Sequence, residues 1–289
     1  MLQQLTPLLK QASLSKRGRK AKPRPIYVSR KVEVRYAKAL LEIVEQMHYE
    51  TKTGLMSLLT PQVGDSLAVG DGILDRFKSI FNRITQSVKD KVSAIAQALA
   101  SKIVNAQKKA SDGQLASMLG KQTGIDFTGL MRDEDLKQAV DEAIAANVGL
   151  IKSIPEQYFD KIEQAVMAGI QGGTLNDTLA DDLQKTYGIS KSRAKLIATD
   201  QLGKINSRLS QIRQQKLGIT HYTWSTSHDE RVRHEHKLRD SKLFAWDNPP
   251  SDGHPGQPIR CRCVAKPYTE HLMGGKSPDE IMAEQNMLQ

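Results

Sequence analysis

Cysteine and aromatic residues are scarce in this sequence. Only two of its 289 residues are cysteine, and Phe, Trp and Tyr together make up 5%. This low aromatic content, with 26% charged residues, favours helices over a large β-sandwich. A chain of this length has room for two domains of ordinary size, each with its own core.

Long apolar runs are also missing. No stretch of the sequence is apolar for long enough to span a bilayer as a helix. The first residues lack the apolar core and the small-residue cleavage site of a secretory signal. The sequence therefore predicts a soluble protein that is made and used without crossing a membrane.

The two cysteines, Cys261 and Cys263, are separated by a single residue. That spacing is too short for an unstrained disulfide within ordinary backbone. A disulfide framework is therefore excluded. Three roles remain open for the pair: inert thiols, an intermolecular bridge, or two ligands of a metal ion.

Positive charge is concentrated at the N-terminal end. Residues 1–35 contain ten Lys or Arg and one acid, so they supply +9 of the formal net charge of +10. With two interleaved prolines, this segment is predicted to be a flexible arm that contacts phosphates or an acidic protein surface. A solvated tail without a partner is the alternative. The candidate contact residues are Lys16, Arg17, Arg19, Lys20, Lys22 and Arg24.

The first half beyond the arm is predicted to be helical. Apolar residues at three- and four-residue spacing predict helices over 32–47 and 73–110, joined by a connection over 48–72. The long apolar seam of the second helix predicts packing on other helices, self-association or insertion into a partner's groove. Glycines in 111–129 predict a linker or hinge. This half carries no catalytic signature.

Helices are also predicted through the middle of the chain. One covers 133–148, a second begins near Pro155 and ends at 172–173, and a third runs from Thr174 to Gly188. Ser190 is predicted to cap a last helix that extends to 218. The glycine turn at Gly188 also resembles that of a helix-turn-helix, in which Lys191 and Arg193 would reach DNA. A tight helical hairpin is the favoured interpretation, because the pattern is short and degenerate.

The stretch His221–Pro267 has a different character. It contains five of the seven histidines and all the cysteines and tryptophans. Alternation and β-forming residues predict strands over 219–226, 243–246 and 261–265, around a short helix or turn at 229–238. Trp224 and Trp246, with Phe244, are expected to form an aromatic cluster.

The predicted fold class is mainly α, with helical N-terminal and middle regions and a small C-terminal α+β domain. The predicted division is an arm (1–31), a helical N-terminal region (32–130), a helical middle region (131–218) and the α+β domain with its tail (219–289).

An ordered set of motifs carries a family resemblance. The run Tyr-x-Trp-x-Thr-x-x-Asp-x-Arg-Val-Arg-x-x-His, from 222 to 236, is followed by Asp240, Phe244 and Trp246, then by Pro-Pro, His-Pro-Gly and Cys-Arg-Cys. With the preceding SKSRAKLIATDQ, these motifs resemble the phage Mu F-like head morphogenesis (minor head protein) family over about 150–267.

The resemblance implies a structural and non-enzymatic role. Members of this family are minor components of tailed-phage heads, associate with the portal vertex and act in head assembly and DNA packaging. The implied partners are the portal protein, the major capsid protein and DNA. The implied location is the virion, with the host cytoplasm during assembly.

One departure from the family bears on metal binding. Many relatives carry Cys-x-x-Cys where this chain has Arg233 and His236, and that form has the look of a zinc site. The candidate ligands in this sequence are His236, His254, Cys261 and Cys263, with His234 as a weaker substitute. Two cysteines alternating across a strand would point to opposite faces and chelate poorly. We therefore expect no cofactor and keep zinc as the alternative.

Charged residues in the same region allow two interpretations. Asp229, Arg231 and Arg233 can form an ion-paired network that, together with Trp224 and Trp246, holds the loop 247–259. Alternatively, they can form a nuclease-like active site with His236 as general base. The structural interpretation is favoured, because the sequence has no phosphate-binding glycine loop or nucleophile elbow.

Overall fold

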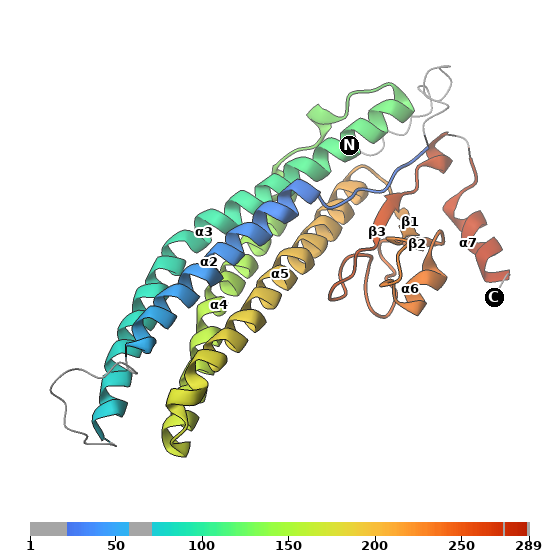
Figure 1. Cartoon of the computed structure of the whole chain (residues 1–289). Coiled ribbons are helices and arrows are strands. Elements are labelled where there is room, and N and C mark those ends of the chain that lie inside the picture. Colours follow the sequence, from blue (N-terminus) through green and yellow to red (C-terminus); the bar gives the residue numbers. More distant parts are fainter. Residues whose placement is uncertain (1–21, 58–70, 274, 288–289) are drawn as a thin grey trace. The chain divides into compact units, whose positions relative to one another are not determined.

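The computed structural model describes residues 22–57, 71–273 and 275–287. Four long helices come first: α2 (Arg30–Met56), α3 (Asp71–Thr123), α4 (Lys137–Gly172) and α5 (Leu175–Lys216). Two short 3₁₀ turns, Thr128–Leu130 and Glu134–Leu136, lie between α3 and α4. The remaining elements are β1 (His221–Ser225), α6 (His234–Arg239), β2 (Leu243–Ala245), β3 (Val264–Pro267), a 3₁₀ turn (Glu270–Met273) and α7 (Pro278–Met287) (Figure 1). The predicted class, mainly α with a small α+β region near the C-terminus, is confirmed.

The chain forms two compact units. The first contains the described residues up to Glu33, together with Ile103–Ala143 and Thr199 onward, and the second contains Val34–Lys102 and Ile144–Ala198. These units are discontinuous in sequence, whereas the predicted division cut the chain at 130 and 218. The difference arises because each of the four long helices contributes residues to both units. No helix among the described residues is long and apolar enough to cross a membrane.

Several predicted helix breaks are wrong. The predicted hinge at 111–129 is helical as far as Thr123, and Gly124 ends α3 with a φ of +77°. Pro155 lies inside α4 rather than at the start of a helix. Ile151, Ile154, Tyr158 and Phe159 on both sides of it are buried. Burial of these side chains outweighs the hydrogen bond that proline removes.

The predicted turn at Gly188 does not exist either. Residues 187–190 lie within α5, so they form neither a helix-turn-helix nor a helical hairpin. The Lys191 ammonium lies 4.9 Å from the centroid of the Tyr187 ring, one turn earlier on the same helix. The Arg193 guanidinium donates to the Ser153 hydroxyl at 2.9 Å. No recognition helix starts at this point, and Arg193 holds α5 to α4.

In the second unit, α3 buries several apolar side chains within the chain itself, but the predicted apolar seam is only partly covered. Phe77, Phe81, Val88, Val92, Ala96 and Ala100 are buried. The ring of Phe81 meets that of Phe159 edge-on, with centroids 5.6 Å apart. The Tyr36 hydroxyl donates to Asn147 at 2.8 Å in the same interior. Self-association through α3 would use the exposed part of this seam, such as Ile95, which is 47% exposed.

In the first unit, the end of the predicted flexible arm is docked. Ile26 is buried in a cluster with Leu115, Met118, Leu119, Phe127, Leu217 and Ile219. Asn206 donates to the Ile26 carbonyl at 2.8 Å, and the Tyr27 N–H donates to Gln114 at 2.9 Å. Lys22 and Arg24 are exposed. Lys16, Arg17, Arg19 and Lys20 lie outside the described residues.

The sheet has the order β2-β1-β3, with both neighbours antiparallel to β1. Tyr222 pairs with Phe244 of β2 and with Pro267 of β3. The three predicted strands exist, but β3 begins at Val264 rather than at 261. Both cysteines thus precede the strand, and the objection that they alternate across it does not hold.

Candidate metal centre

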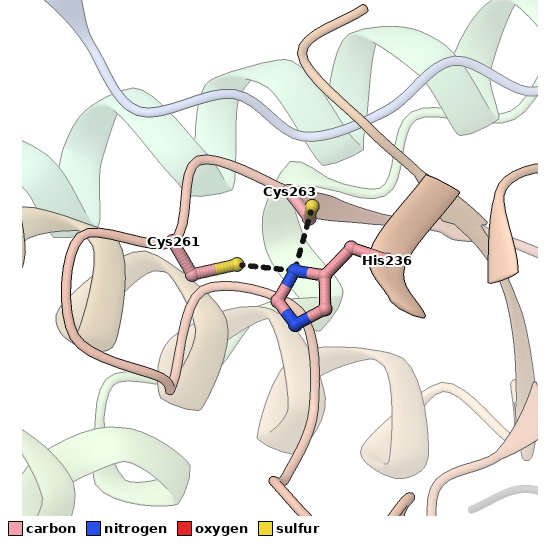
Figure 2. A group of neighbouring side chains, drawn as sticks. All are labelled: His236, Cys261 and Cys263. Atoms are coloured by element: carbon pink, nitrogen blue, oxygen red, sulfur yellow. Dashed lines mark hydrogen bonds between the residues drawn. The ribbon is translucent and has the colours of Figure 1, made fainter. Parts of the chain in front are cut away.

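Three possible metal ligands converge in the C-terminal region. The Nδ1 atom of His236 lies 3.6 Å from the Cys261 sulfur and 3.5 Å from the Cys263 sulfur (Figure 2). Their ligand atoms lie within 4.8 Å of one another, and all three residues are buried. His236 comes from α6, and the cysteines come from the segment just before β3. The group therefore connects two elements that are separated in sequence.

A tight turn presents Cys261. Its N–H donates to the Pro258 carbonyl at 2.9 Å, and Arg260 has a φ of +59°. The N–H of Gly256 points at the Cys261 sulfur, 3.4 Å away. Asp200 of α5 accepts a hydrogen bond from the Arg260 N–H at 3.0 Å. Helix α5 thus holds this turn through Asp200, and the backbone N–H of Gly256 is aimed at the Cys261 sulfur.

The imidazole of His236 is oriented by an acid. Its Nε2 atom lies 2.8 Å from Asp252 Oδ2, and Arg239 donates to the other oxygen of Asp252 at 2.5 Å. Because a carboxylate only accepts, Nε2 carries the hydrogen, and the lone pair of Nδ1 faces the two sulfurs. Burial raises the pKa of Asp252, but hydrogen bonds from His236 and Arg239 outweigh it and leave that pKa below its ordinary value. Asp252 is therefore a carboxylate suited to orienting the ring.

The two thiols influence each other strongly. A hydrogen bond from Cys263 lowers the pKa of Cys261 to about 6, and the Gly256 amide contributes in the same direction. The pairing with Cys261 and burial raise the pKa of Cys263, and the Trp224 indole opposes them. The Trp224 Nε1–H is itself buried without a hydrogen-bond partner in the described part of the chain. The pocket thus favours loss of the proton from Cys261 over loss from Cys263, and the Trp224 indole favours the charged form of Cys263.

Of the four predicted ligands, His254 lies elsewhere. Its Nδ1 atom is 3.0 Å from the Tyr222 hydroxyl and its Nε2 atom is 3.4 Å from the Gln211 amide. Burial lowers the pKa of His254 and keeps the ring neutral. His234 is exposed on α6. His254 therefore belongs to the aromatic core, and the structure brings together only three of the predicted donors.

The predicted aromatic cluster is present. Trp224 and Trp246 are buried with Tyr222, and Phe244 packs against them. The rings of Tyr222 and Trp246 have centroids 4.2 Å apart, and the Trp246 indole N–H donates to Gln214 of α5 at 3.1 Å. Burying such rings contributes about 2–3 kcal/mol each. This cluster anchors the sheet on the last turns of α5.

The predicted ion-pair network has other partners. Asp229 pairs with Arg262 and accepts a hydrogen bond from the backbone N–H of Arg231, at 3.0 Å. The Arg233 guanidinium donates to the Ile259 carbonyl at 2.6 Å. Pairing of Asp229 with the Arg231 or Arg233 side chain is therefore wrong, although Arg233 does hold the predicted loop.

The nuclease-like arrangement is not formed either. Asp229 is engaged by Arg262 near the surface, whereas His236 is 2% exposed and faces sulfur. Arg239 and Asp252, which orient His236, were not among the predicted site residues. Arg239 lies three residues after His236 on the same helix face, and this spacing could have predicted that the two side chains are neighbours. Asp252 lies in an irregular loop, where spacing carries no such information.

These features define a class of protein: mainly helical, with a small antiparallel sheet that carries a buried aromatic cluster and a His-Cys-Cys group. Residues 160–266 match the family described as Phage Mu protein F like protein. This part of the chain is therefore similar to the Mu protein F-like family, which its motifs also resemble.

A curated relative extends beyond that segment. An uncharacterized protein of Haemophilus influenzae is 32% identical over 278 residues, which cover 94% of this chain. The chain spans 60% of the length of that relative. No solved structure matches the chain.

Proposed function

We propose that this protein is a structural, non-catalytic component of a tailed-phage head that acts in head morphogenesis. The observation that carries the proposal is the match of 160–266 to the Mu protein F-like family. That segment contains the aromatic cluster, the His-Cys-Cys group and the loop that Arg233 holds. The motifs that carry the family resemblance are thus parts of one folded core. This is expected if members of the family use this region in head assembly.

The proposed partners are the portal protein, the major capsid protein and DNA, and the proposed location is the virion. The basic segment (residues 1–35) is suited to contact phosphates, because its Lys22 and Arg24 side chains are exposed. Arg193 is engaged with Ser153, which makes α5 a poor candidate for DNA contact. The basic segment is therefore the better site for DNA.

The test is the composition of assembled heads. The tagged full chain would be produced together with portal and major capsid proteins, and particles would be purified on a density gradient. We expect it to sediment with the particles and to be recovered with portal protein after they are dissociated. Absence from particles in which portal is present would overturn the proposal.

A second assay addresses catalysis. The purified chain and a His236→Ala variant would be incubated with double- and single-stranded DNA and with RNA. We expect no cleavage by either protein. Turnover by the wild-type chain that the variant lacks would instead support the nuclease alternative.

A further inference from the structure

We propose that His236, Cys261 and Cys263 bind one zinc ion through Nδ1 and the two sulfurs. This inference does not depend on the proposed role in the phage head. It differs from the ligand set expected from sequence, since His254 is excluded. The assigned role is structural: the ion ties α6 to the turn before β3.

The spacing of the donors suits a tetrahedral ion. Zinc binds sulfur at about 2.3 Å and imidazole nitrogen at about 2.0 Å, so tetrahedral angles place the two ligand atoms about 3.5 Å apart. The observed separations from His236 Nδ1 are 3.6 Å to Cys261 and 3.5 Å to Cys263. The two separations between nitrogen and sulfur therefore already match those around a shared zinc ion, and the three ligand atoms lie within 4.8 Å of one another (Figure 2).

The surrounding groups match those of a metal site. Zinc-bound histidines commonly donate their second ring N–H to a carboxylate, as His236 does to Asp252 at 2.8 Å. Arg239 fixes that carboxylate and lies over the Trp224 ring, 5.2 Å from its centroid. The Gly256 N–H is aimed at the Cys261 sulfur, where it would stabilise a bound thiolate.

The donor types select the metal. Two thiolates and one imidazole suit zinc, whereas magnesium and calcium prefer oxygen ligands. A disulfide is disfavoured, because one residue separates the cysteines and both are free thiols in the structure. Without a metal, the site would hold two buried thiols and a buried imidazole whose Nδ1 meets only sulfur, a weak hydrogen-bond partner.

Burial argues for a structural rather than a catalytic ion. The Trp224 ring lies edge-to-face with the His236 ring, with centroids 5.1 Å apart, and Trp224 itself is fully buried. A macromolecular substrate cannot reach the ion through this packing. The sheet has three short strands, so an ion that joins α6 to the segment before β3 adds folding free energy to a small core.

The experiment measures metal in the full chain, purified under reducing conditions without chelator. We expect about one zinc per chain by elemental analysis. After removal of zinc, titration with cobalt should produce the visible bands of a tetrahedral thiolate site. A wild-type chain that contains no zinc, and neither binds added zinc nor develops cobalt bands, would overturn the proposal.

Variants assign the ligands. Cys261→Ser, Cys263→Ser and His236→Ala should each lose the zinc, while the matched control His254→Gln, which changes a neighbouring buried imidazole, should retain it. Asp252→Asn should keep the site but weaken zinc affinity about tenfold or more. If a ligand variant does not fold, the zinc content of the wild type and the Asp252→Asn affinity still decide the question. Retention of zinc by a folded Cys263→Ser variant, or loss from folded His254→Gln, would refute the assigned ligand set.

Discussion

The backbone of Gly256 lies directly against that of Gly203. A Cβ atom added to Gly256 would stand 3.0 Å from the Gly203 carbonyl oxygen, and Gly256 has a φ of +88°. Helix α5 and the turn that presents Cys261 can approach this closely only because both positions lack a side chain. The contact sets the position of one ligand of the proposed metal centre.

Gly256→Ala should therefore destabilise the protein by roughly 1–3 kcal/mol, from an unfavourable φ and a backbone clash. The measurement is urea unfolding followed by tryptophan fluorescence, since both tryptophans lie in the sheet region. Gly188→Ala is the control, because a Cβ there meets nothing within 4 Å. This helical substitution should be neutral or stabilise by up to about 1 kcal/mol. Equal stability of the two variants would contradict the close approach.

Arg213 should be a major determinant of stability in the first unit. It is 2% exposed, donates to Asp112 through Nε at 2.8 Å and through a terminal nitrogen at 3.0 Å, and also donates to the Arg132 carbonyl. Arg213→Ala removes a buried guanidinium and its bonds to Asp112 and to the Arg132 carbonyl, and it leaves Lys108 as the remaining ion-pair partner of Asp112. The substitution should cost roughly 3 kcal/mol. Arg208→Ala, an exposed position on the same helix, should change stability by no more than about 0.5 kcal/mol. Thermal unfolding of the two variants checks the difference.

The basic segment should bind DNA through its charge. Replacing Arg19, Lys20 and Lys22 with Gln should lower affinity at low salt and make the dependence of affinity on salt less steep. The matched control replaces Arg83, Lys102 and Lys109 of α3, which removes the same charge. Fluorescence anisotropy with duplex DNA over a salt series measures both. If the two triple variants weaken DNA binding equally, binding depends on the net charge of the protein and not on the basic segment. Truncation should stop at 21, because Ile26 is part of the core.

Substitutions along α3 should separate packing from association. Val88 is 3% exposed, so Val88→Asp should destabilise the protein by about 3 kcal/mol or more. Ile95 is 47% exposed, so Ile95→Asp should leave the stability nearly unchanged. If α3 mediates self-association, Ile95→Asp should reduce it in sedimentation experiments. Self-association that a folded Ile95→Asp variant retains in full would place the interface elsewhere.

Patterning in the sequence was enough for the broad architecture. Apolar residues at helical spacing indicated the long helices, and the change to alternation after 218 indicated the small sheet. Trp224 and Trp246 were expected to cluster, because large aromatic residues in a short α+β segment have few other places to be buried. The Cys-x-Cys spacing excluded a disulfide, and the ordered motifs indicated the family now matched over 160–266.

Only tertiary structure decided where helices end and which donors meet. Gly113, Gly188 and Pro155 are local helix breakers, yet each lies inside a helix, since burial along the whole helix outweighs a cost of about 1–3 kcal/mol at one position. His254 and His236 look alike in sequence, but one packs on Tyr222 and the other faces sulfur. Which histidine meets the two sulfurs depends on a turn with a positive φ at Arg260 and on the contacts of that turn with α5. Such long-range contacts leave no periodic signal in the sequence.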